Sequence, residues 1–180
     1  MNLTELKNKL PDYAKDIKLN LSMLTTDEEH MDLTTKQIQQ IMLATAFATK
    51  NFFLIQQFSN EMLAHLSIAE IDAAKAAATM MSMTNIYYRF LHLVSDKSFS
   101  SLPAKLRMNI IAQPGIDKVD FELSCLAVSA LNGCGLCIDA HTKELLKHGL
   151  TQIAIQSAIR IASVMNAAAM SLEIETTISP

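Results

Sequence analysis

The chain has 180 residues, half of them hydrophobic, which is enough to bury one sizeable core. Fifteen Lys and Arg residues against eighteen Asp and Glu residues give a net charge of −3, and the absence of a basic patch argues against a nucleic-acid partner. The N-terminal segment lacks the apolar core of a secretory signal and no run reaches eighteen uninterrupted apolar residues, so we expect a cytoplasmic protein without a membrane segment.

The chain is expected to be almost entirely helical. Glycine and proline occur only four times each, while residues that favour helix, such as alanine, leucine and lysine, are abundant. No segment shows the alternating pattern of a β-strand, so the predicted fold class is all-α. In chain order, helices are predicted over 4–24 with a break or restart at Pro11, 34–48, 51–65, 67–83 with a continuation over 85–94, 103–110, 117 onward, 134–147 and 151–173. Connectors are predicted over 25–33, 95–102 and 113–115.

Four chemically active residues lie close together in the second half of the chain: Glu122, Cys134, Cys137 and His141. Positions 134, 137 and 141 share one face of a helix that begins near Cys134, because residues three and seven apart stack on one side. A thiol pair beside a base is what reversible disulfide chemistry requires. Three cysteines, two of them in a CxxC motif, are typical of catalysis or metal binding rather than of a disulfide scaffold.

The predicted geometry adds the glutamate to this group. Asn132-Gly133 predicts a turn between two helices; Glu122 lies ten residues before Asn132 and His141 lies nine after it. An antiparallel helical hairpin would therefore bring the two side chains level. In the predicted relay, Glu122 orients His141, and His141 takes the proton of Cys137, its neighbour four residues earlier.

The residues alone leave two alternatives open. Cys134 is expected at a helix N-terminus, where the dipole favours a thiolate, so either sulfur can react first, although the position of His141 favours Cys137. The two cysteines, His141 and Glu122 also supply four potential zinc ligands. Redox chemistry is favoured over metal binding because paired zinc motifs usually contain a second cysteine pair, and this chain has one pair.

An internal repeat is predicted from a shift of 83 residues. This shift aligns the helix cap at Thr34 with Asp117, and the capping-box residue Gln37 with Asp120. One small helical unit cannot cover its apolar face alone, which gives a physical reason for two copies.

The two predicted repeats carry different chemistry. We expect a single domain over 1–180, with a degenerate helical repeat at 34–94 and a catalytic helical repeat at 117–173. In the first repeat, the positions that match the four chemical residues hold groups without redox chemistry: Gln39, Asn51, Leu54 and Phe58.

The same residues carry a resemblance to a known family. The segments MSMTNIYYRFLHL and LRMNIIAQPGIDKVDFELSCLAVSALNGCGLCIDAHTKELL resemble the alkylhydroperoxidase D (AhpD) family, within the wider carboxymuconolactone decarboxylase-like superfamily. The resemblance is densest over residues 80–169, and its specific signature is Glu-x11-Cys-x2-Cys-x3-His. It implies an all-helical fold with an internally duplicated helical unit, and a homotrimer.

The resemblance also implies a function. The chain would be an antioxidant thiol peroxidase that reduces alkyl hydroperoxides through a dithiol–disulfide cycle, in which Cys137 attacks the peroxide and Cys134 resolves the product. Glu122 and His141 would form the proton relay. No bound cofactor is implied. Dihydrolipoamide on a lipoylated dehydrogenase-complex acyltransferase would be the reductant, and the peroxiredoxin alkyl hydroperoxide reductase C would be a partner.

One position departs from the pattern of some family members, which carry a second histidine between the two cysteines. This chain has Leu136 there, which leaves the relay complete but affects the expected turnover rate and preferred peroxide. An alternative function is an electron adaptor that passes reducing equivalents from a lipoyl domain to the partner peroxiredoxin, with little peroxidase activity of its own. Both functions use the same cysteines, so the sequence does not separate them.

Overall fold

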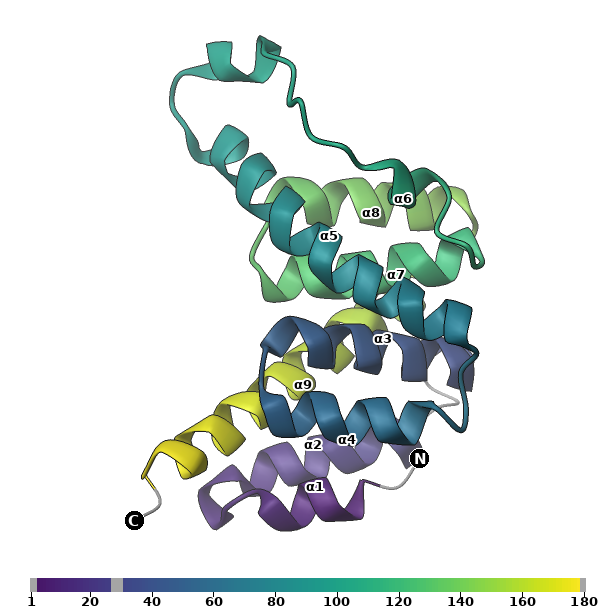
Figure 1. Cartoon of the computed structure of the whole chain (residues 1–180), viewed down its shortest axis with the longest axis vertical. Coiled ribbons are helices and arrows are strands. Elements are labelled where there is room, and N and C mark those ends of the chain that lie inside the picture. Colours follow the sequence, from purple (N-terminus) through teal and green to yellow (C-terminus); the bar gives the residue numbers. More distant parts are fainter. Residues whose placement is uncertain (1–2, 27–30, 179–180) are drawn as a thin grey trace.

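The computed structural model describes residues 3–26 and 31–178, and every regular element in these ranges is a helix (Figure 1). The predicted all-α fold class is therefore confirmed. The α-helices are α1 (Thr4–Lys9), α2 (Lys15–Thr26), α3 (Thr35–Thr49), α4 (Phe52–Met62), α5 (Ile68–Leu93), α6 (Asn109–Ala112), α7 (Lys118–Leu131), α8 (Gly135–Lys147) and α9 (Gln152–Ile178). Two short 3-10 helices are η1 (Asp12–Ala14) and η3 (Lys97–Ser101).

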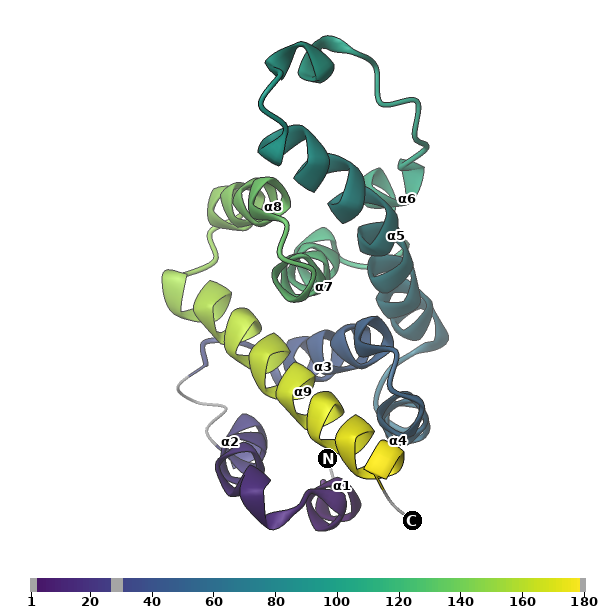
Figure 2. The same cartoon turned by 90° about the vertical axis from the view of Figure 1, so that its left-hand side faces the viewer.

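Helix α3 lies at the centre of the molecule. Most of its residues are buried, and it packs against α4, α5, α7 and α9. Helix α7 in turn packs against α5, α8 and α9, so that α3, α5, α7 and α9 together enclose the core. Figures 1 and 2 show α1 and α2 at one end of the molecule and α8 towards the other, beside α7. The two helices that carry the chemical residues, α7 and α8, thus rest on the core from one side.

The C-terminal helix α9 is a core helix. Among the described residues it is the one helix long and apolar enough to cross a membrane, over Gln152–Thr177, and half of that window is buried inside the protein. The buried side packs against α2, α3 and α7, which accounts for its apolar composition.

Side-chain caps determine where several helices begin. Thr34 and Gln37 form the predicted capping box at the start of α3, with the Thr34 hydroxyl accepting from the Gln37 amide at 3.2 Å. The Asn51 side chain caps α4, and the Asp117 side chain caps α7 as predicted. These caps satisfy amide groups that have no partner within the first turn of a helix.

The segment between η3 and α7 differs from its prediction. A helix was expected over 103–110, but the chain is irregular up to Met108 and only the single turn of α6 follows. Leu102 is extended before Pro103, as the proline ring requires, and Lys105 has a left-handed φ of 51°. The segment buries no side chain fully, so packing gives it no reason to become helical.

Several predicted boundaries also move. The two segments expected over 67–83 and 85–94 form one helix, α5, and the last helix extends to Ile178. The connector expected over 25–33 begins later, because α2 continues to Thr26; positions 27–30 of that prediction lie outside the described residues.

Two helices of the first half and two of the second half begin at positions separated by the same number of residues. Lys118 of α7 lies 83 residues after Thr35 of α3, and Gly135 of α8 lies 83 residues after Phe52 of α4. Gln37 and Asp120, which the predicted repeat pairs, contact each other directly through a hydrogen bond of 2.8 Å. The division into two repeats within one domain stays a prediction.

Candidate active site

The helices α7 and α8 form the hairpin that the sequence predicts. Helix α7 ends at Leu131, and the chain reverses through Asn132 and Gly133, whose φ of 67° suits a residue without a side chain. Cys134 then caps α8, and its amide returns to the Ser129 carbonyl at 3.1 Å. The turn therefore places the first cysteine directly at the helix N-terminus.

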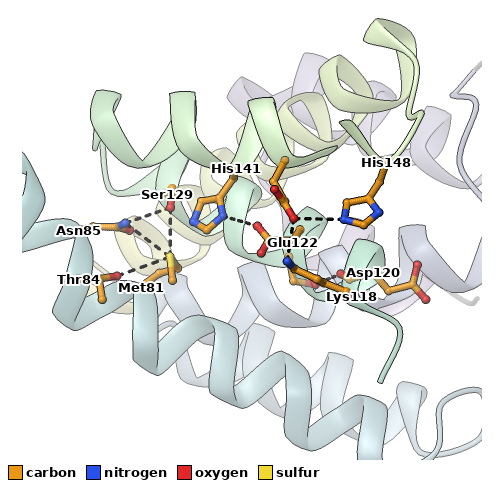
Figure 3. Close-up of polar contacts among 11 residues, drawn as sticks. Met81, Thr84, Asn85, Lys118, Asp120, Glu122, Ser129, His141 and His148 are labelled. Atoms are coloured by element: carbon orange, nitrogen blue, oxygen red, sulfur yellow. Dashed lines mark hydrogen bonds and ion pairs between the residues drawn. The ribbon is translucent and has the colours of Figure 1, made fainter. Parts of the chain in front are cut away.

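The hairpin brings Glu122 of α7 and His141 of α8 into contact (Figure 3). Glu122 Oε2 lies 2.6 Å from His141 Nδ1, and the two residues are only 4% and 9% exposed. A buried carboxylate needs such a partner, because its desolvation would otherwise favour the protonated form. With Glu122 ionised, Nδ1 donates the hydrogen bond and Nε2 is left as the basic nitrogen of the ring.

Cys134 and Cys137 form a disulfide across the first turn of α8, with Cα atoms 5.3 Å apart. Cys134 is completely buried, whereas Cys137 is 7% exposed. The Cys137 amide donates to Cys134 Sγ at 3.4 Å, so the inner sulfur accepts from the helix N-terminus. The N-terminus of α8 therefore faces Cys134 Sγ, while access from outside is confined to Cys137.

Cys137 opens onto a pocket of about 200 Å³ between α5, α6 and α8. Its lining consists of Thr84, Tyr88, Ile111, Leu136, Cys137 and Ala140. A larger cavity of about 330 Å³ lies on another side of α5, next to Lys50, Arg89 and Asn166, and contains no cysteine. The smaller pocket is the one relevant to chemistry because a sulfur forms part of its wall.

A buried polar cluster holds the turn that precedes the cysteines. Asn85 of α5 donates from Nδ2 to Ser129 Oγ at 3.0 Å and accepts at Oδ1 from Asn132 Nδ2 at 3.0 Å. Arg89, one turn further along α5, donates to the Asn132 carbonyl at 2.7 Å. The sulfur of Met81 lies within hydrogen-bond reach of Asn85 and Ser129 (Figure 3). Helix α5 thereby clamps the end of α7.

This cluster was not predicted from the sequence. One signal was present, because Asn85 lies four residues after Met81 on a helix face that is otherwise apolar. A polar side chain on a buried face needs hydrogen-bond partners. The identity of those partners depends on how α5 crosses α7, which the sequence pattern does not give.

The third cysteine, Cys125, is free and completely buried on α7. Burial raises the pKa of its thiol well above the usual range, and the nearby charge of Glu122 acts in the same direction. A thiol in this setting stays protonated at neutral pH.

No group of three or more His, Cys, Asp or Glu side chains within residues 3–26 and 31–178 is arranged to hold a metal ion. The four residues considered as zinc ligands are instead engaged in pairs, the two sulfurs with each other and Glu122 with His141.

The fold and the site together define a helical protein with a disulfide beside a buried glutamate–histidine pair. The family model of the carboxymuconolactone decarboxylase family matches residues 98–172, which include the whole α7–α8 hairpin. The match spans less than half of the chain.

Similar proteins specify the family. An alkyl hydroperoxide reductase AhpD from Coxiella burnetii (strain RSA 493 / Nine Mile phase I) is 54% identical over 164 residues, 91% of this chain and 93% of the relative. Proteins of the same name from Beijerinckia indica and Brucella suis are 51% identical over 173 residues and 48% identical over 177 residues. They cover 96% and 98% of this chain, and 94% and 99% of their own lengths. The chain therefore belongs to the AhpD family.

Proposed function

We propose that this protein is an antioxidant thiol peroxidase that reduces alkyl hydroperoxides through Cys134 and Cys137. The observation that carries the proposal is the arrangement on one hairpin of a buried Glu122–His141 pair and a cysteine pair whose outer sulfur opens onto a pocket. The name shared by the similar proteins, alkyl hydroperoxide reductase AhpD, supports it.

In the oxidative half-reaction, His141 removes the proton of Cys137, which lies one helical turn before it on the same helix face. Glu122 holds the imidazole and stabilises its cationic form. The Cys137 thiolate attacks the distal oxygen of the hydroperoxide. The O–O bond breaks, the departing alkoxide takes from His141 the proton that His141 had removed from Cys137 and leaves as the alcohol, and Cys137 becomes a sulfenic acid. The thiol of Cys134 then attacks this sulfur, which forms the disulfide and releases water.

In the reductive half-reaction, an external dithiol attacks the disulfide at Cys137, the accessible sulfur. Cys134 leaves as a thiolate, which the Cys137 amide and the N-terminus of α8 stabilise. The second thiol of the reductant then displaces Cys137 and closes its own disulfide. We propose dihydrolipoamide as this reductant. The protein itself needs no bound cofactor for the cycle.

The proposed setting is the bacterial cytoplasm, because the similar proteins come from bacteria. The proposed partners are a lipoylated dehydrogenase-complex acyltransferase, which supplies electrons, and alkyl hydroperoxide reductase C. We also propose a homotrimer, which light scattering on a sizing column would test.

The decisive experiment measures reduction of an organic hydroperoxide by the purified protein with dihydrolipoamide, beside the Cys137→Ser and Cys134→Ser variants. We expect turnover by the parent protein and none by either variant. If the parent does not turn over while dihydrolipoamide still reduces its disulfide, the protein is an electron adaptor. If the variants retain the parent rate, the cysteine pair is not the site of reaction.

A further inference from the structure

We propose that the pocket at Cys137 makes this protein selective for bulky, apolar hydroperoxides, with Leu136 as a specificity-determining residue. The proposal rests on the peroxidase function above and adds the class of substrate. It follows from the chemistry, the size and the position of the pocket.

The wall of the pocket is apolar, although two of its lining residues carry hydroxyl groups. The Thr84 hydroxyl donates to the Met80 carbonyl at 3.0 Å, within its own helix. The Tyr88 hydroxyl donates to the sulfur of Met108 at 3.8 Å. Both polar groups are therefore engaged elsewhere, and the remaining wall is made of the aliphatic side chains of α6 and α8 with the outer sulfur.

The pocket is also much larger than a peroxide group. Its volume of about 200 Å³ exceeds the engineered apolar cavity of about 150 Å³ that binds benzene. A molecule of hydrogen peroxide would fill a small part of this space and lose hydrogen bonds to water, because no free polar group of the wall replaces them. An aryl or branched alkyl group instead fills the space and is itself desolvated.

Leu136 lies between the two cysteines and lines the pocket next to Cys137. Leu136 is 43% exposed, so it belongs both to the pocket wall and to the outer surface beside it. A polar residue at this position would put a hydrated group against the apolar part of the substrate. Because each buried methylene contributes about 0.8 kcal/mol, each carbon of the substrate that enters the pocket should raise the rate constant about fourfold.

The test is a single-turnover oxidation of the pre-reduced, full-length protein by cumene hydroperoxide, tert-butyl hydroperoxide and hydrogen peroxide. Acid quenching and thiol labelling follow loss of the two thiols, so no reductant takes part. Each rate constant is divided by that of a free small thiol with the same peroxide, which removes differences in intrinsic reactivity. We expect the normalised values to fall from cumene to tert-butyl to hydrogen peroxide, and to span more than about tenfold.

Leu136→Asn should lower the ratio of the cumene to the hydrogen peroxide value about tenfold. Leu146→Asn is the matched control, because Leu146 lies on the same helix, is 45% exposed and does not line the pocket; its ratio should equal that of the parent. If Leu136→Asn fails to fold by circular dichroism, Ile111→Asn on α6 replaces it.

Equal normalised values for the three peroxides, or a parent-like ratio in a folded Leu136→Asn protein, would overturn the substrate class. Loss of the thiols with none of the peroxides would instead overturn the peroxidase function itself.

Discussion

At the scale of single residues, the short hydrogen bond between Glu122 and His141 orients the imidazole at this site. Sequence spacing was sufficient to predict the contact, because a turn at Asn132-Gly133 places the two positions level in a hairpin. The difference between Cys134 and Cys137 was not predictable in the same way. It depends on how deeply the packed helices bury each residue, Cys134 completely and Cys137 to 7% exposure, and CxxC spacing alone contains no such information.

Glu122→Gln should slow peroxide-driven oxidation of the cysteine pair without unfolding the protein. Glutamine has nearly the shape of glutamate, but it cannot stabilise a cationic imidazole, so His141 becomes a weaker base. A single relay group of this kind is worth about 10²-fold or more in rate. Stopped-flow mixing with an organic hydroperoxide would measure the loss.

The matched control is Glu144→Gln on α8, since the Glu144 carboxylate contacts Lys118 and His148 rather than His141. It should keep the parent rate. A parent rate in Glu122→Gln would contradict the relay.

At the scale of elements, helix caps and turns were the features that the sequence predicted reliably. Thr34, Asn51 and Asp117 mark helix starts because their side chains bond locally, within three residues. The prediction of a helix over 103–110 was wrong, because a segment of helix-favouring composition does not form a helix when it buries no side chain fully. The clamp by Asn85 lay beyond prediction, since its partners come from another helix more than forty residues away.

Asn85→Ala should destabilise the contact between α5 and the α7–α8 turn. The substitution removes the donor to Ser129 Oγ and the acceptor of Asn132 Nδ2, which costs about 1–3 kcal/mol of unfolding free energy. Urea denaturation of the disulfide form would measure it.

Thr79→Ala provides the comparison, because Thr79 is exposed on the same helix and its hydroxyl bonds only to the helix backbone. Its effect should stay within about 0.5 kcal/mol. Equal stabilities of the two variants would show that the clamp is not structural.

At the scale of the whole molecule, ion pairs tie neighbouring helices together within each half of the chain. Hydrogen bonding from Lys36 lowers the pKa of Glu70, which ties α5 to α3, and Lys118 likewise lowers the pKa of Glu144, which ties α8 to α7. Burial raises the pKa of Asp120 instead. The all-helical class was predictable from composition, but these pairings depend on the packing of distant helices.

The melting temperature should therefore depend on pH in acid. The two groups with lowered pKa values contribute stability above their unfolded pKa of 4.5 and lose it as the pH falls through their folded values. Calorimetry from pH 6 to pH 3 should show that Glu70→Gln and Glu144→Gln each flatten this decline. Asp120→Asn should steepen it, because protonation of a group with a raised pKa favours the folded state. Parallel curves for all four proteins would contradict these assignments.

Because Cys125 is completely buried, the reactivity of its thiol reports whether the protein is unfolded. A thiol-specific dye added to the reduced, native chain should react with Cys137 alone, because Cys125 and Cys134 are completely buried. Denaturant should release the other two sulfhydryl groups. The count of reactive sulfhydryls would then report the unfolded fraction in a chain that has no tryptophan to fluoresce, and any variant described above can be screened for integrity by that count alone.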